Sequence, residues 1–238
     1  MIVRRKVRER PLPQVADNLP ASVHPVLRRV LLTRGVTTRG QLELGFEQLL
    51  RPDDLGGIDA AAALLADAVA EQQRILVVGD FDADGATGTA LAVLALRAMG
   101  ATALDFRVPN RFEYGYGLTP GLVETLADHP PDLLVTVDSG INCLAGVERA
   151  GELGCRVIVT DHHLPGERLP AADAIVNPNC PGDGFPSKSL AGVGVMFYLL
   201  SGVRRVLSER GWFTGKRRPP RLADYLDLVA LGTVADLV

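Results

Sequence analysis

Aromatic residues are scarce in this sequence, since Phe, Trp and Tyr together make up 5% of its 238 residues. Alanine, valine, leucine and glycine are plentiful instead, and this composition favours an α/β architecture over a β-sandwich. Cysteine is also rare. The three cysteines, Cys143, Cys155 and Cys180, contain no CxxC pair and no even set. This excludes a disulfide framework and predicts reduced thiols in a cytoplasmic protein.

Long apolar runs are missing as well. No stretch reaches the length of a transmembrane helix without a charge or a break, so no membrane association is expected. The basic start lacks the apolar core of a signal peptide, because PLPQVADNLP follows it. The net charge of -3 excludes a uniformly basic nucleic-acid binder. Basic residues nevertheless gather at 4–10 and at 204–221, as is typical of a solvated surface or of phosphate contact.

The first 73 residues predict a helical N-terminal segment. Residues 1–20 are basic and then proline-rich, so they are expected to be extended. Helical spacing follows at 24–36, at 37–50 with Thr38 as a plausible N-cap, and at the alanine-rich stretch 58–73. With 47% hydrophobic residues, the whole chain is long enough to bury a sizeable core.

From residue 74 onward, short apolar runs alternate with helical patterns. Strands are expected within RILVVGD, ALDFRVPNR, PDLLVTVD, CRVIVTD and ADAIVNP. Helices are expected between the strands and again within 191–210 and 221–238. Nearly continuous Val, Ile and Leu indicate strands that are buried on both faces, as in parallel sheets covered by helices. The predicted fold is therefore α/β, a largely parallel sheet flanked by helices, with the helical N-terminal segment packed on this core.

Acidic residues and histidines follow three of the predicted strands. They are Asp80, Asp82 and Asp84 after ILVVG, Asp138 after LLVTV, and Asp161, His162 and His163 after RVIVT. Ligands of open parallel sheets bind beyond the carboxyl ends of the strands. A single acid at such a position often only caps the next helix, but three coincident cases favour a common site.

The side chains at these strand ends are suited to a divalent metal. Carboxylates with imidazole and without thiolates suit Mg²⁺ or Mn²⁺, and the imidazole favours Mn²⁺. Several carboxylates indicate two ions, because one ion would be over-neutralised. Two ions about 3.5–4 Å apart are a recurring device for phosphoryl hydrolysis.

Five ordered motifs resemble the DHH phosphoesterase superfamily. They are DFDADG, VDSG, TDHH, VNP and GTVADL, and the triplet at 161–163 gives that family its name. LLTRGVTT, VPNRFEYGYGL and SLAGVGVMFYLL resemble its branch of bacterial single-strand-specific 5′→3′ exonucleases. The resemblance implies that 74–238 is a DHH metal-binding domain. It also implies degradation of single-stranded DNA to 5′-mononucleotides in DNA repair and recombination, with a single-strand-binding protein and a RecQ-type helicase as partners.

The same resemblance implies roles for individual residues. The metal ligands would be Asp82, Asp84, Asp138, His162 and Asp236, with Asp138 bridging two ions. His163 would contact the phosphate. Asp161 would orient a histidine or cap a helix rather than bind metal, and Asp80 would be either a ligand or a hydrogen-bonding support.

Four residues are candidates for substrate binding: Arg111, Tyr114, Asn177 and Ser189. Arg111 and Tyr114, with Tyr116 nearby, would meet phosphate or stack on a base, or would be ordinary surface residues. Asn177 would lie beside the site, or only form a turn before Pro178. Ser189 precedes a helix start that could cradle phosphate or be an ordinary N-cap.

Several alternatives stay open. The pyrophosphatase branch of the superfamily has a histidine where this sequence has Val78, which disfavours that activity. Another phosphatase of the superfamily, acting on short oligonucleotides or nucleoside bisphosphates, and a truncated non-catalytic nucleic-acid-binding module remain. Exonucleases of this branch continue into a second phosphate-binding domain and an oligonucleotide-binding fold. The sequence is therefore expected to be an N-terminal fragment with weak activity of its own.

Overall fold

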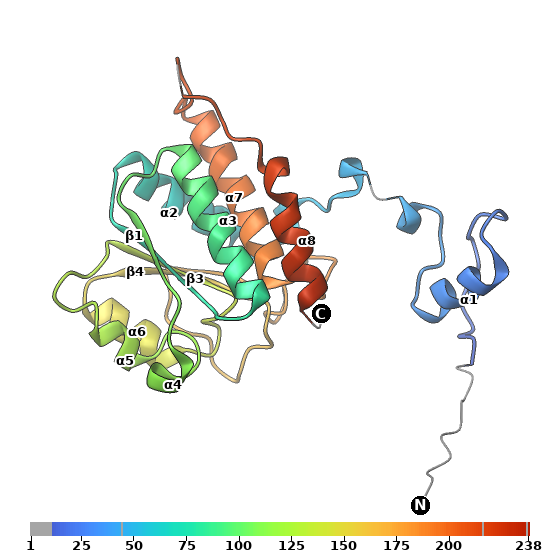
Figure 1. Ribbon diagram of the computed structural model, residues 1–238, viewed down its shortest axis with the longest axis horizontal. Coiled ribbons are helices and arrows are strands. Elements are labelled where there is room, and N and C mark those ends of the chain that lie inside the picture. Colours follow the sequence, from blue (N-terminus) through green and yellow to red (C-terminus); the bar gives the residue numbers. More distant parts are fainter. Residues whose placement is uncertain (1–10, 44, 216, 237) are drawn as a thin grey trace, which may run out of the picture. The chain divides into compact units, whose positions relative to one another are not determined.

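The computed structural model describes residues 11–43, 45–215, 217–236 and 238. The chain divides into two compact units, of which the first ends at Leu50 and the second spans Arg51–Val238 (Figure 1). The predicted extended start falls partly on residues 1–10, which lie outside the described residues. Residues 11–20 contain no helix or strand and form one bridge, between Asn18 and Thr38.

Among residues 11–43 and 45–50, the first unit contains one α-helix. This helix, α1 (Pro25–Thr33), ends shortly before Gly35, as the sequence predicted. The prediction of a second helix over 37–50 is wrong, because the described residues of this stretch form two 3₁₀ turns, η1 (Gly40–Leu42) and η2 (Phe46–Gln48), and no α-helix. Two glycines within this stretch weaken helix formation.

Thr38 caps no helix in this unit. Its backbone N–H donates to Oε1 of Gln41 at 3.1 Å, and the N–H of Thr37 donates to the same oxygen at 2.8 Å. The glutamine side chain therefore closes a local turn, where the sequence pattern predicted a helix start.

The second unit is built on a five-stranded parallel sheet with the order β2-β1-β3-β4-β5. The strands are β1 (Ile75–Gly79), β2 (Leu104–Arg107), β3 (Leu133–Val137), β4 (Arg156–Thr160) and β5 (Ala174–Val176). Every residue of β1 and β3 is buried, which explains their continuous apolar runs. The predicted fold class is confirmed.

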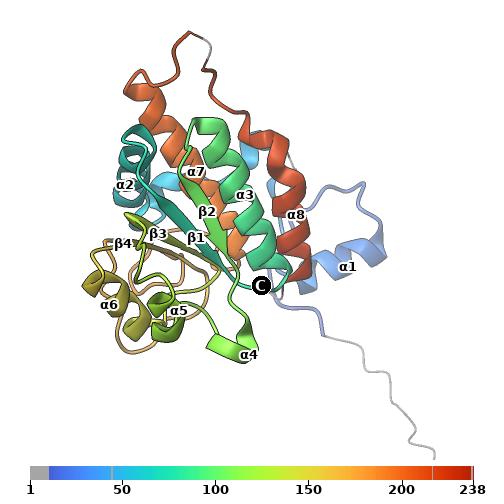
Figure 2. The ribbon, with the colours of Figure 1, turned by 60° about the vertical axis from the view of Figure 1, so that its left-hand side comes forward.

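Helices cover both faces of this sheet. One layer holds α2 (Ile58–Ala70), α3 (Ala83–Met99), α7 (Gly192–Glu209) and α8 (Leu226–Ala235), and Figures 1 and 2 show α3, α7 and α8 side by side. The other face carries α5 (Pro120–Glu124) and α6 (Leu144–Glu152). The one-turn α4 (Arg111–Tyr114) and the 3₁₀ turns η3 (Pro52–Asp54) and η4 (Leu222–Tyr225) complete the unit.

The helix α2 belongs to this larger unit. Its buried residues Ala61, Ala62 and Leu65 join the same core cluster as α7, and α2 packs directly on α7. The compact units therefore divide after Leu50, whereas the sequence placed the end of the N-terminal segment at residue 73. Among the described residues, no helix combines the length and the apolar character needed to cross a bilayer.

Candidate metal centre

The turn between β1 and α3 carries three aspartates. Asp82 is the N-cap of α3, and its Oδ1 accepts a hydrogen bond from the N–H of Gly85 at 2.9 Å. Asp84 lies in the first turn of α3 and is buried. Its two carboxylate oxygens accept from the N–H groups of Gly192 at 2.6 Å and Val193 at 2.8 Å. The start of α7 therefore holds Asp84 in place, as expected of an anion at a helix N-terminus.

Asp138 follows β3 in an uncommon backbone conformation. Its φ of 58° lies in the left-handed region, which non-glycine residues rarely adopt and which concentrates at functional sites. The residue is 1% exposed. A Cβ atom on Gly192 would lie 2.7 Å from both Cβ and Oδ1 of Asp138. Only a glycine lets α7 approach this aspartate so closely.

Asp161 organises the turn after β4. Its Oδ1 accepts from the backbone N–H groups of His162 at 2.7 Å and His163 at 3.0 Å and contacts Nδ1 of His163 at 2.7 Å. Its Oδ2 accepts from the N–H of Ile141 at 2.9 Å. Although burial acts to raise it, these hydrogen bonds hold the pKa of Asp161 below its usual range. The contact between Oδ1 of Asp161 and Nδ1 of His163 raises the pKa of His163 to about 9.

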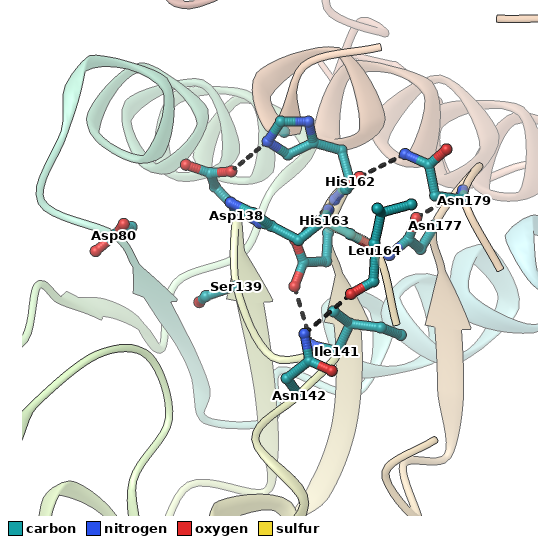
Figure 3. Close-up of polar contacts among 12 residues, drawn as sticks. Asp80, Asp138, Ser139, Ile141, Asn142, His162, His163, Leu164, Asn177 and Asn179 are labelled. Atoms are coloured by element: carbon teal, nitrogen blue, oxygen red, sulfur yellow. Dashed lines mark hydrogen bonds and ion pairs between the residues drawn. The ribbon is translucent and has the colours of Figure 1, made fainter. Parts of the chain in front are cut away.

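His162 points into a ring of carboxylates. Its Nε2 lies 3.1 Å from Oδ1 of Asp138, 3.5 Å from Oδ2 of Asp236 and 3.7 Å from Oδ2 of Asp84 (Figure 3 shows the contact with Asp138). Burial by itself would lower the pKa of His162, but Asp138 and the other carboxylates raise it above its ordinary value. Asp236 follows α8, so four separate segments meet at this imidazole.

The acidic side chains form two groups whose ligand atoms lie within 4.8 Å of one another. One group is Asp84, His162 and Asp236, and the other is Asp80, Asp82 and Asp138. Asp138 also forms a third such group with His162 and His163. Because His162 belongs to the first group and Asp138 to the second, this third group connects the other two.

This cluster fits divalent cations. Oδ1 of Asp138 and Oδ2 of Asp236 are buried and accept no hydrogen bond of good geometry from the described residues. Burial raises the pKa of Asp138 to about 7, and it also raises the pKa values of Asp84 and Asp80. Buried carboxylates this close together are costly unless a cation neutralises them, and oxygen ligands with one imidazole suit Mg²⁺ or Mn²⁺.

A cleft of about 390 Å³ opens beside the second group. It is lined by Asp80, Asp82, Arg111, Tyr116, Gly140, Asn142, Asp161 and His163. Nη2 of Arg111 lies 3.5 Å from Oδ2 of Asp80, and its guanidinium stacks 3.7 Å above the ring of Phe81. Arg111 is thus placed at the cleft, as one reading of the sequence expected.

The structure places the other three substrate-binding candidates away from the cleft lining. Tyr114 packs against the smaller core cluster between the sheet and α5 and α6, and Tyr116 lines the cleft instead. Asn177 is buried, and its amide donates to the carbonyl of His163 at 2.9 Å. It therefore supports the histidine turn from behind.

Ser189, the remaining substrate-binding candidate, is exposed and precedes α7. The N–H groups of Gly192 and Val193 at this helix start donate to Asp84, so these two amides are already occupied where one interpretation of the sequence placed a phosphate.

The structure also shows residues that the sequence reasoning missed. Asn142 donates through Nδ2 to the carbonyl of Leu164 at 3.1 Å (Figure 3) and accepts from the N–H of Gly166 at 2.8 Å. These two hydrogen bonds hold the loop after the histidines in place. Asn179 donates to the carbonyl of His162 at 2.5 Å. Nothing in their sequence pattern marks them, since the contacts join distant loops.

The comparisons with known proteins agree with this geometry. The family described as "DHH family, N-terminal domain" matches residues 74–233. The chain is 53% identical over 234 residues to the single-stranded-DNA-specific exonuclease RecJ of Escherichia coli (strain K12). That alignment covers 98% of this chain and 40% of the E. coli protein, so the chain spans well under half of this relative's length.

Two crystal structures of RecJ from Thermus thermophilus are similar to this chain. The complex with Mn²⁺ has a TM-score of 0.69 at 35% identity, covering 87% of this chain and 28% of that one. The complex with Mg²⁺ has a TM-score of 0.58 at 31% identity, covering 91% of this chain and 25% of that one.

Proposed function

The chain belongs to the DHH family, and on that premise we propose that its metal centre hydrolyses phosphodiester bonds of single-stranded DNA. We further propose degradation in the 5′→3′ direction to 5′-mononucleotides, in DNA repair and recombination. The name of the E. coli relative, a single-stranded-DNA-specific exonuclease, supports the substrate class.

One observation supports the proposal: Asp138 belongs to two groups of metal-ligand atoms, one with Asp80 and Asp82 and one with His162 and His163, beside an open cleft. Asp84, His162 and Asp236 would hold one ion, Asp80 and Asp82 would hold the other, and Asp138 would be shared. The RecJ structures with Mn²⁺ and with Mg²⁺ support either metal as the cofactor. When bound, two such ions would lower the pKa of a water and neutralise charge on the phosphate oxygens.

The remaining residues of the cleft would handle the substrate. His163 has an exposed ring and a pKa raised to about 9, so near neutral pH it presents a positive charge and a donor at Nε2 toward a phosphate. Asp161 would keep this ring oriented through its contact with Nδ1. Arg111, whose Nη2 lies 3.5 Å from Oδ2 of Asp80, supplies a second cation at the cleft. Such groups bind the backbone without reading its sequence.

The proposal extends to the location and the partners of the protein. We propose a cytoplasmic enzyme, since its three free cysteines would stay reduced there. A single-strand-binding protein that delivers the substrate and a RecQ-type helicase that unwinds duplex DNA are the proposed partners.

A nuclease assay tests the function. Single-stranded DNA labelled at its 5′ end is incubated with the chain and Mn²⁺, in parallel with the same strand labelled at its 3′ end. We expect labelled mononucleotide first from the 5′-labelled strand, little product from a duplex, and none with a chelator.

A matched pair of variants completes the test. Asp82→Asn should lose at least about a hundredfold in rate, because a ligand and its charge are lost. The exposed Asp128→Asn should match wild type. Metal-independent cleavage, or release from the 3′ end first, would contradict the proposal.

A further inference from the structure

Tyr116 reaches the metal centre from the loop between α4 and α5. Its hydroxyl donates to the backbone carbonyl of Asp138 at 3.2 Å, across 22 positions of sequence. Gly117 permits this approach, since its φ is 69° and a Cβ there would lie 2.7 Å from Sγ of Cys143. The loop conformation therefore directs this tyrosine into the cleft.

Tyr116 binds the backbone of a residue whose conformation is strained. Asp138 is the non-glycine residue with left-handed backbone at the metal centre, and this conformation costs free energy unless neighbouring groups maintain it. Its carbonyl accepts the tyrosine hydroxyl, while its side chain faces His162. If Asp138 left its left-handed conformation, its carboxylate would turn away from the neighbouring ligand atoms of Asp80, Asp82 and His162.

The tyrosine ring makes separate contacts with the same site. It meets the ring of His163 edge-on, at 6.1 Å between centroids and 81° between planes. The guanidinium of Arg111 lies 5.3 Å from its centroid. The hydroxyl and the ring can thus be removed separately by substitution, which makes their roles distinguishable.

We propose that Tyr116 is a positioning residue that holds the left-handed backbone of Asp138, and through it the carboxylate that lies close to Asp80, Asp82 and His162, in place for metal binding. This inference rests on the proposed function of the metal centre. It assigns the hydroxyl a task in metal binding, and the ring a task in placing His163.

Calorimetric titration of the full chain with Mn²⁺ alone tests the role of the hydroxyl. Tyr116→Phe keeps the ring and should weaken Mn²⁺ binding by about three- to tenfold, the change that corresponds to one net hydrogen bond. The melting temperature of the metal-free protein should stay close to that of wild type. Tyr114→Phe, at the end of α4 two residues before Tyr116 but packed on the smaller core, should change neither quantity.

A second variant addresses the ring. Tyr116→Leu should weaken Mn²⁺ binding as Tyr116→Phe does, and it alone should also shift the NMR signals of the His163 ring. Wild-type Mn²⁺ affinity in Tyr116→Phe would overturn the proposal. A lower melting temperature with unchanged affinity would overturn it too, since it would show a purely structural role. The titration measures binding alone, so a chain that binds Mn²⁺ without cleaving DNA would refute the proposed function separately.

Discussion

Substitution of Gly192 by alanine is the sharpest test of how α7 shapes the metal centre. The added Cβ would lie 2.7 Å from Cβ and Oδ1 of Asp138 and 2.9 Å from its Cγ. Such approaches are far inside van der Waals contact, and the atoms involved are not the free end of a flexible side chain. Either Asp138 or the start of α7 must move, and the start of α7 also holds Asp84.

The expected change in folding stability of Gly192→Ala follows from two opposing effects. Overpacking of a tight site costs about 1–3 kcal/mol. Replacing glycine by alanine in a helix returns about 0.5–1 kcal/mol. The net loss of up to about 2.5 kcal/mol would lower the melting temperature of a chain of this size by up to roughly 10 °C. Displacement of ligands from both acidic groups should weaken Mn²⁺ binding by at least about tenfold, or 1.4 kcal/mol.

The assay combines thermal unfolding of the metal-free protein with calorimetric titration of Mn²⁺. Gly151→Ala is the matched control, because it lies on α6 and its added Cβ would meet no atom within 4 Å. This control should keep its Mn²⁺ affinity and lose no stability. If Gly192→Ala matches wild type in both measurements, α7 does not constrain Asp138 and the argument for the close approach is wrong.

Three further predictions concern the metal centre. Asp138→Ala should abolish Mn²⁺-dependent hydrolysis, because its carboxylate lies within 4.8 Å of ligand atoms of Asp80 and Asp82 and also of His162, and activity within tenfold of wild type would argue against sharing. Saturation with Mn²⁺ at a hundred times its Kd should stabilise the fold by about 2.7 kcal/mol. This raises the melting temperature by roughly 5–11 °C, reversibly with a chelator, and an unchanged melting curve would exclude a specific site. Because burial raises the pKa of Asp138 to about 7, this carboxyl is protonated below that pH, and Mn²⁺ must then displace the proton. Affinity should therefore fall as the pH is lowered from about 8 to 6, and calorimetry in two buffers of different ionisation enthalpy should detect the released proton. A flat profile would contradict the raised pKa.

The order of strands and helices in the larger unit could be predicted from the sequence, because the periodicity of apolar residues reports local burial. The runs ILVVG and LLVTV became fully buried neighbours in a parallel sheet. The positions of Asp84, Asp138 and His162 after three such strands were enough to expect one cluster, since the carboxyl ends of parallel strands share an edge. The same local reasoning failed over 37–50, where two glycines interrupt an otherwise helical pattern.

Only the tertiary structure decided which side chains enter the site and which support it. Tyr114, at the end of α4, and Tyr116, in the loop after it, are two positions apart, yet one packs on the core and the other reaches Asp138. The start of α7 is occupied by Asp84, a partner more than a hundred residues away along the chain. Loop side chains point where distant contacts hold them, and a sequence pattern records only their neighbours along the chain. The sequence alone therefore determined the edge at which the metal centre forms, and packing determined the geometry of that centre.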